Sequence, residues 1–320
     1  MGVRSTDCRM PFGWRLVSVL AALSIGAAPA LARGDSGTIS APVAVHETAD
    51  LGDAFRAANN ARSAAPRGRV LLILDIDNTL LTMPQYLGGD GWFNHHAAMI
   101  AAGSDPDFRD MGELIAAQTM LFGIGSMRAT EQGIPAMLTE AARQKIDLFL
   151  LSARGPDLYD ATRRELDRSG LRIEAPYACS FFLCTDDGIY GDSEIRAALT
   201  AIGEVPQPSS YRKILIRDGV MLVAGQDKGV MLKLLMGAIG GQDYAHVVVA
   251  DDGRKNIDAL AASGNPVPMT LFHYRRIDPS VTAGEEKAAR VRFQALTAAL
   301  CAAVQSALCR EPASPIGSGK

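Results

Sequence analysis

The sequence predicts an α/β fold in which a doubly wound, mostly parallel sheet carries a largely helical cap, inserted after the first core strand. Short apolar runs at 70–74, 146–151 and 246–250 have the length and composition of strands that are buried on both faces. Helical patterns alternate with the later strands, as they do in βαβ units. An insert of several tens of residues separates the first two runs, which is far longer than an ordinary connection.

Length and composition bound the possible functions. The chain has 320 residues, of which 48% are hydrophobic and 21% are charged, so it can bury a sizeable core. Its formal net charge is −3 and it has no basic run, which argues against nucleic acid or an anionic membrane surface as a partner. We therefore do not expect nucleic acid as a partner, and the sequence leaves the oligomeric state open.

The first 32 residues have the pattern of a cleaved signal peptide. Three arginines, at positions 4, 9 and 15, precede a short apolar run at 16–28, and Ala30-Leu31-Ala32 follows as a cleavage site. The run is shorter than the roughly 18–20 residues that a spanning helix needs, so an N-terminal membrane anchor is the less favoured alternative. We expect a cut after Ala32, a periplasmic or secreted protein, and no membrane span in the mature chain.

Cysteine usage is compatible with export. Cys8 leaves with the signal peptide, and the four remaining cysteines are an even number, which permits disulfides in an oxidising compartment. A bond between Cys301 and Cys309 would require the helix predicted around them to break, because eight residues at about 1.5 Å each place them about 12 Å apart. No spacing indicates a zinc site. The pairing stays open among Cys179, Cys184, Cys301 and Cys309.

The mature chain divides into a lead-in, a core in two parts, a cap and a tail. The lead-in begins with a flexible stretch at 33–45, rich in Gly, Ser and Pro, and continues with a supporting helix at 49–63. Further elements are expected as strands at 178–184, 189–191, 219–224 and 270–274 and as helices at 156–169, 230–239 and 285–308. The boundaries are 33–66 for the lead-in, 67–83 and 136–310 for the Rossmann-like core, 84–135 for the cap and 311–320 for the tail.

Chemically active residues follow the predicted strands. The carboxyl ends of parallel strands meet at one edge of the sheet, where open α/β sheets bind their ligands. Carboxylates that are close enough to repel one another suit a hard cation such as Mg²⁺, and a carboxylate nucleophile beside a cation suits phosphoryl transfer. The residues are Asp75 and Asp77 after the first strand, Ser152 after the second, Lys228 at a helix start, and Asp251 and Asp252 after the strand at 246–250.

Between about residues 70 and 258 this pattern resembles the four motifs of the haloacid dehalogenase-like (HAD) superfamily of aspartate-nucleophile phosphatases. The first motif is similar to 75–79 (DIDNT). The resemblance implies that Asp75 is the nucleophile and a metal ligand. It also implies that Asp77 is the general acid/base and binds the metal through its backbone carbonyl. The neighbouring Asn78 is then expected to contact the phosphate.

The other three motifs complete the implied site. Ser152 resembles the second motif and would hold the phosphoryl group, and Lys228 resembles the third and would stabilise the nucleophile and the transferring charge. Asp251 and Asp252 resemble the fourth motif, as the remaining Mg²⁺ ligands, and Asn256 would support the site from the following helix. The segments YLGGDGWF, GVMLVAGQDKG and ADDGRKNI are similar to a functionally uncharacterised bacterial branch of the superfamily.

The resemblance implies an exported, Mg²⁺-dependent phosphomonoesterase that works through an aspartyl-phosphate on a small phosphorylated molecule. Two alternatives stay open, a phosphotransferase or phosphomutase and a non-catalytic binding protein that uses the cap surface. Arg154 is expected to form a surface ion pair in preference to a substrate contact. The ring side chains of the cap either shape the pocket or pack within the insert, and they are Trp92, Phe93, His95 and His96.

Overall fold

An eight-stranded sheet with the order β1-β10-β9-β2-β5-β8-β7-β6 forms the centre of the molecule. The computed structural model describes residues 41–173, 188–207, 210–278 and 280–304, all within one unit, Ile39–Lys320. The six strands from β1 to β8 are parallel, whereas β7 and β6 run antiparallel to their neighbours. The strands are β1 (Val43–Thr48), β2 (Arg69–Leu74), β5 (Asp147–Ser152), β6 (Gly188–Tyr190), β7 (Ile214–Arg217), β8 (Val220–Leu222), β9 (Tyr244–Asp251) and β10 (Met269–Tyr274).

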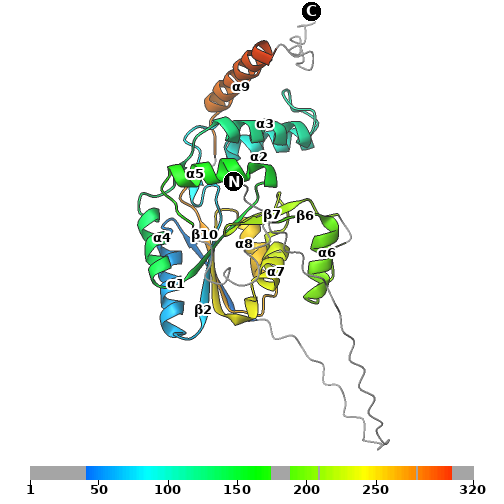
Figure 1. Ribbon diagram of the computed structural model, residues 1–320. Helices are drawn as coiled ribbons and strands as arrows, with labels where there is room; N and C mark the ends of the chain where they lie inside the picture. The colour runs from blue at the N-terminus through cyan, green and yellow to red at the C-terminus, as the bar shows by residue number, and fades with distance from the viewer. Residues whose placement is uncertain (1–40, 174–187, 208–209, 279, 305–320) are drawn as a thin grey trace, which may run out of the picture. The chain divides into compact units, whose positions relative to one another are not determined.

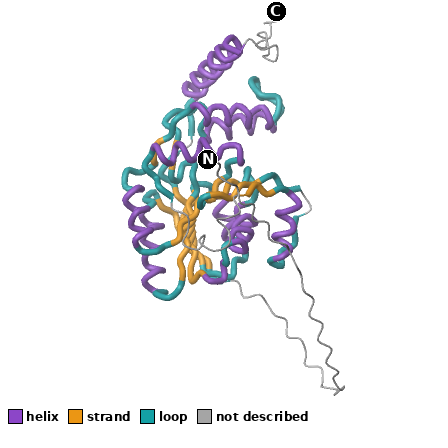
Figure 2. Tube along the Cα trace, viewed as in Figure 1, coloured by secondary structure: helices purple, strands orange, loops and turns teal. Residues whose placement is uncertain are grey.

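Helices cover both faces of the sheet, which gives the three layers of a doubly wound fold (Figures 1 and 2). One face packs against α1 (Gly52–Ala64), α4 (Ile134–Arg143) and α5 (Tyr159–Arg168). The other packs against α6 (Asp192–Ala201), α7 (Lys228–Ala238) and α8 (Arg254–Ala261). The predicted fold class, an α/β protein with a mostly parallel, Rossmann-like sheet, is confirmed.

The central strand β2 explains why the two faces are both apolar. Val70, Leu72 and Leu74 point into the hydrophobic cluster under α1 and α4, and Leu71 and Ile73 point into the cluster under α7 and α8. All five side chains have no exposed surface. Burial of each side chain contributes about 1.5–3 kcal/mol to stability. Packing on both faces therefore fixes the position of β2 and of the residues that follow it.

The insert after β2 is closed at its base by a small antiparallel pair, β3 (Leu81–Thr82) and β4 (Arg128–Ala129). It contains two helices, α2 (Asp90–Ala101) and α3 (Met111–Ile124). Trp92 lies between them with 1% of its surface exposed and meets the ring of Phe108 edge-on, with the centroids 5.7 Å apart. The ring residues of the insert therefore form a small core of their own.

The C-terminal helix α9 (Ala283–Val304) packs onto this insert core, although the two are far apart in the sequence. Its Phe293 ring lies 5.8 Å from that of Trp92, and Arg290 Nε donates to Asp107 Oδ1 at 3.1 Å. His95 Nε2 lies 3.2 Å from Glu286 Oε1. The helical pattern of α9 predicted a helix but not the surface that it contacts.

Two parts of the sheet were not predicted. The prediction of a flexible stretch at 33–45 was wrong at its C-terminal end, because Val43–Thr48 forms the edge strand β1, which pairs with β10. Four of its six side chains are exposed, so it lacks the pattern of a half-buried strand. The hairpin between β7 and β8 turns through Asp218 and Gly219, both with positive φ (48° and 74°), which is the Asp-Gly turn typical of two-residue hairpins.

Other expectations reach the limits of the described residues. The strand expected at 178–184 and the end of the helix at 305–308 lie outside them. Cys301 on α9 is disulfide-bonded, and its partner also lies outside them, so the pairing stays open. Within the described part of the chain, no helix combines the length and the apolar character needed to cross a membrane.

Candidate active site

The strands β2, β5 and β9 end side by side at one edge of the sheet. Leu74, the last residue of β2, pairs with Leu150 on one side and with Ala250 on the other. The main-chain N–H of Asp75 donates to the carbonyl oxygen of Ala250 at 3.0 Å, which continues the pairing by one residue. This register brings three predicted site residues to the same edge, namely Asp75, Ser152 and Asp251.

Lys228 bridges two of the carboxylates. Its Nζ donates to Asp75 Oδ1 and to Asp251 Oδ2, each at 2.6 Å, and the Lys228 side chain is 1% exposed. Burial alone would lower the pKa of Lys228, but the charges of Asp251 and Asp75 raise it overall, so the lysine is held as a cation. A buried positive charge thus sits between the candidate nucleophile and its neighbour.

The start of α7 positions this lysine. Asp227 caps the helix, with its Oδ1 accepting from the N–H of Val230 at 3.0 Å. At Gly229 a Cβ atom would lie 2.3 Å from the carbonyl oxygen of Ala259, so only glycine lets the first turn of α7 approach α8 this closely. The sequence Asp-Lys-Gly therefore directs Lys228 toward the carboxyl edge of the sheet.

Three carboxyl groups at this edge can hold a metal ion. One oxygen from each of Asp75, Asp251 and Asp252 lies within 4.8 Å of the other two. Burial raises the pKa of Asp75 to about 7 against the opposing charge of Lys228, and burial together with the charges of Asp75 and Asp251 raises the pKa of Asp252 to about 9. Hard oxygen donors that repel one another fit a divalent cation such as Mg²⁺.

The loop after β9 holds Asp251 from the other side. Its Oδ1 accepts from the N–H of Gly253 at 2.8 Å and from Nδ2 of Asn256 at 2.9 Å. A Cβ atom at Gly253 would lie 2.7 Å from that same amide nitrogen, so a side chain there would displace the Asn256 amide from Asp251. The backbone carbonyl of Asp252 is 3.0 Å from His273 Nε2. Asn256 therefore orients a candidate metal ligand.

Asp77 pairs with Arg154. Arg154 Nε donates to Asp77 Oδ2 and its Nη2 donates to Asp77 Oδ1, both at 2.8 Å. The arginine side chain is only 3% exposed, donates to Thr162 Oγ1 at 2.7 Å and lies over the ring of Phe122 at 4.6 Å. The expected ion pair is present, but the expectation of a surface pair was wrong, because Phe122 of the insert covers the guanidinium.

Asn78 and Asp90 link the first motif to the insert. Asn78 has a left-handed backbone (φ 55°), which asparagine tolerates, and its N–H donates to Leu81 O at 2.7 Å. Its Nδ2 donates to Asp90 Oδ2 at 2.9 Å, while its Oδ1 accepts from Thr82 Oγ1 at 3.1 Å. In this arrangement Asn78 positions Asp90, and its expected phosphate contact stays a prediction.

Sequence reasoning missed Asp90, and it expected the arginine beside Asp77 only as part of a surface ion pair. Asp90 is the first residue of α2, and burial together with the charges of Asp77 and Asp75 raises its pKa to about 8. Nothing in the local pattern around Asp90 distinguishes it from an ordinary helix start. Arg154 lies two residues after Ser152, and its N–H donates to the fully buried Ser152 Oγ at 3.2 Å.

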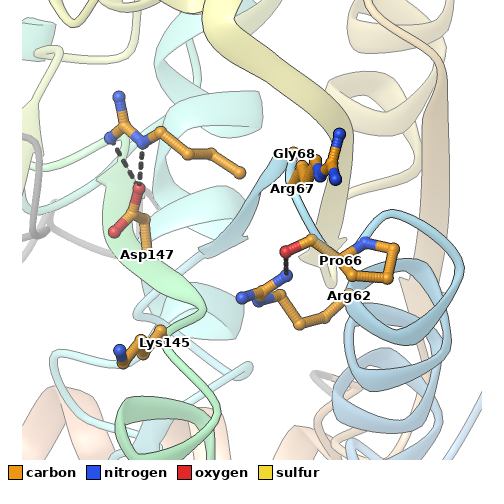
Figure 3. A pocket seen from close by; sticks show the side chains of 7 residues that line it. Arg62, Pro66, Arg67, Gly68, Lys145 and Asp147 are labelled. Atoms are coloured by element: carbon orange, nitrogen blue, oxygen red, sulfur yellow. Dashed lines mark hydrogen bonds and ion pairs between the residues drawn. The ribbon is translucent and has the colours of Figure 1, made fainter.

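A pocket of about 400 Å³ opens at the other end of β2, away from this edge (Figure 3). It is lined by Arg62, Arg67, Arg69, Lys145 and Asp147, together with Pro66 and Gly68. Arg69 Nη2 donates to Asp147 Oδ2 at 2.6 Å, and Arg62 Nη1 donates to the carbonyl oxygen of Pro66 at 2.8 Å. The guanidinium groups of Arg69 and Arg62 therefore bind other groups of the protein and stabilise the N-terminal ends of β2 and β5.

The fold and the site together define a class of protein, a doubly wound α/β protein with a buried lysine and several aspartates at the carboxyl edge of its sheet. The chain belongs to the DUF2608 family, described as proteins of unknown function, whose model matches residues 50–304. No curated protein matches the sequence significantly.

Among solved structures, the chain is similar to two of a class C acid phosphatase from Bacillus anthracis. Both are 14% identical to this chain, and both matches cover 76% of it. The first match covers 88% of the phosphatase chain with a TM-score of 0.31, and the match to the tungstate-bound structure covers 90% of that chain with a TM-score of 0.30. A putative beta-phosphoglucomutase from Thermotoga maritima is 11% identical, over 70% of this chain and 98% of that chain, with a TM-score of 0.25. Similarities at this level carry no functional assignment, which therefore rests on the site.

Proposed function

We propose that the protein is a divalent-metal-dependent phosphomonoesterase of the HAD type, with Asp75 as the nucleophile and a small phosphorylated molecule as the substrate. The observation that carries the proposal is the position of Lys228 Nζ, 2.6 Å from both Asp75 and Asp251. A buried carboxylate beside a fixed cation can approach phosphorus while the developing charge is neutralised. The third carboxylate within 4.8 Å, Asp252, completes a set that fits Mg²⁺.

In the first step a carboxylate oxygen of Asp75 attacks phosphorus, and the bond from phosphorus to the ester oxygen breaks. Asp77, in its protonated form, gives its proton to the departing oxygen, so the alcohol leaves neutral. Lys228 stabilises the charge on the transferring group. The bound Mg²⁺, held by Asp75, Asp251 and Asp252, would neutralise phosphoryl oxygens and so favour the approach of the anionic nucleophile.

In the second step water attacks the phosphorus of the aspartyl-phosphate. Asp77 takes the proton from this water, the bond between phosphorus and the Asp75 oxygen breaks, and inorganic phosphate leaves. Both carboxyl groups are then back in their starting forms. Ser152, at the end of the neighbouring strand β5, would hold the phosphoryl group during both steps.

One observation favours a second candidate, a non-catalytic binding protein with the same fold. Asp77 accepts two hydrogen bonds from Arg154. To carry a proton, its carboxylate must give up at least one of these bonds. The rival requires no such movement. Release of p-nitrophenol from p-nitrophenyl phosphate, with Mg²⁺ and with excess chelator, distinguishes the two. We expect Mg²⁺-dependent release that Asp75→Asn abolishes, and no release between pH 5 and 9 would favour the binding protein.

We also propose that the protein is exported after cleavage behind Ala32. The disulfide at Cys301 supports this proposal, because disulfides persist in oxidising compartments and are rare in the cytosol. The mass of the protein recovered from the periplasm or the medium tests it. A chain that begins at Arg33 is the expected result, and a chain that still carries residues 1–32 would contradict the cleavage.

A further inference from the structure

Asp90 brings an additional carboxylate from the insert to the candidate active site. It is the first residue of α2, and its Oδ2 accepts from Nδ2 of Asn78 at 2.9 Å. Asn78 is in turn held through its Oδ1 by the hydroxyl of Thr82 at 3.1 Å. This chain of hydrogen bonds ties Asp90 to the loop that carries Asp77, so its position relative to the site does not depend on the insert alone.

The bond to Asn78 distinguishes Asp90 from an ordinary helix-start residue. Aspartate is favoured in the first turn of any helix, where it accepts from free N–H groups or interacts with the helix dipole. No N–H of α2 donates to the Asp90 side chain, and the N-cap residue is Gly89. The second oxygen of Asp90, Oδ1, has no donor among the described residues. The carboxylate is therefore turned toward the site rather than toward its own helix.

The charge balance gives this orientation a consequence. Five carboxyl groups lie at this edge with two cations, Lys228 and Arg154. The carboxyl groups are those of Asp75, Asp77, Asp90, Asp251 and Asp252. When all seven groups are ionised, the site carries three more negative charges than positive ones. A divalent cation held by Asp75, Asp251 and Asp252 would offset two of these charges. Asp90 is not in that group of three, and among the charges that act on it Asp77 is foremost. The Asp90 carboxyl group is therefore left to meet a positive group of the substrate, which would lower its raised pKa and favour the carboxylate form.

In the proposed reaction Asp77 donates its proton to the leaving oxygen, so the side of the site next to Asp77 is the side of the leaving group. We propose that Asp90 is a specificity-determining residue that selects phosphomonoesters with an amino group close to the ester oxygen, as in amino-alcohol and amino-sugar phosphates. This inference rests on the proposed function. A carboxylate in this place accepts from an ammonium group, whereas it repels a leaving group that carries a carboxylate.

A series of two-carbon phosphomonoesters tests the proposal at constant size. The substrates are 2-aminoethyl phosphate, ethyl phosphate and phosphoglycolate, with inorganic phosphate as the readout and p-nitrophenyl phosphate as the reference. They are compared at about pH 9, above the raised pKa of Asp90 of about 8. We expect kcat/KM for 2-aminoethyl phosphate to exceed that for ethyl phosphate by about tenfold or more, and phosphoglycolate to fall about tenfold below ethyl phosphate. In Asp90→Asn both ratios should come within about threefold of one.

The matched control is Asp160→Asn, which removes an exposed carboxylate of α5 that has no ion pair or hydrogen bond among the described residues. It should keep both wild-type ratios. The proposal is wrong if the wild-type ratios are close to one, or if Asp90→Asn keeps the preference and changes only the unfolding temperature. It is also wrong if this variant raises the Mg²⁺ concentration for half-maximal activity and leaves the ratios unchanged. Hydrolysis of p-nitrophenyl phosphate without selectivity overturns this inference alone, whereas no hydrolysis of any ester overturns the proposed function as well.

Discussion

Arg154 holds the carboxylate of Asp77 at two points, with Nε and Nη2 each 2.8 Å from one of its oxygens. A planar guanidinium fixes the direction of a carboxylate in a way that an ammonium group cannot. Because Arg154 also lies over Phe122 of α3, the same side chain joins the candidate acid/base to the insert. The orientation of this candidate proton donor therefore depends in part on the packing of the insert against Arg154.

We predict that Arg154→Ala lowers kcat by about a hundredfold, at the lower end of what general acid–base catalysis contributes. Arg154→Lys should recover only part of this loss, because it keeps the charge and not the two-point geometry. The measurement is the separate determination of kcat and KM with p-nitrophenyl phosphate. Arg143→Lys is the control, since Arg143 forms an exposed pair with Glu140. A raised KM with unchanged kcat would mean that Arg154 binds substrate instead.

Lys228 should be important for stability as well as for activity. Its removal in Lys228→Met leaves Asp75 and Asp251 as buried carboxylates without their shared cation, which costs about 3–5 kcal/mol. Urea unfolding in the presence of chelator measures this loss. The control Lys233→Met breaks a partly exposed pair with Glu204 and should cost about 1 kcal/mol or less. Equal losses in the two variants would contradict the central position of Lys228.

Without a divalent cation, the stability of the protein should fall as the pH rises from about 4 to about 9. Burial and neighbouring charges raise the pKa of Asp75 to about 7, of Asp90 to about 8 and of Asp252 to about 9. Over this range the folded state keeps protons that the unfolded state has released. The free energy of unfolding therefore decreases as the pH rises. Mg²⁺ held by Asp75, Asp251 and Asp252 would replace the protons of Asp75 and Asp252. The increase in Tm that Mg²⁺ produces should therefore grow with pH, to about 5 °C or more near pH 8.

Thermal unfolding with Mg²⁺ and with chelator, at several pH values, measures this increase. Taking the difference between the two removes groups outside the site, such as His246, whose pKa burial lowers and which therefore changes stability in the opposite direction. Asp252→Asn should make the Mg²⁺ effect smaller and less dependent on pH. A Tm that Mg²⁺ does not change at any pH would contradict the metal site.

The sequence predicts the sheet and the edge at which the strands that carry the candidate site residues end, because both depend on local patterns. An apolar run such as 70–74 identifies a strand buried on both faces, and the parallel arrangement then brings Asp75 and Asp251 together. Lys228 follows from the helix start at Asp-Lys-Gly. The chemical roles of these residues stay predictions, but their positions required no knowledge of distant contacts.

The parts that could not be predicted depend on packing between distant segments. Arg154 meets Asp77 because Phe122 and Thr162 enclose its side chain, and no spacing in the sequence encodes this enclosure. Asp90 reaches the site because α2 docks beside Asn78. Likewise, the helical pattern of α9 shows an apolar face and does not show that the insert is its partner.

The central claim, that Asp75 attacks phosphorus, is tested most directly by trapping the intermediate. The protein is mixed with p-nitrophenyl phosphate and Mg²⁺, quenched with acid and digested, and the peptides are analysed by mass spectrometry. Asp77→Asn should prolong the life of the intermediate, because it lacks the base that activates water. We expect a phosphoryl group on the peptide that contains Asp75, removable by hydroxylamine and absent in Asp75→Asn. Turnover without this adduct, or full activity in Asp75→Asn, would contradict the account.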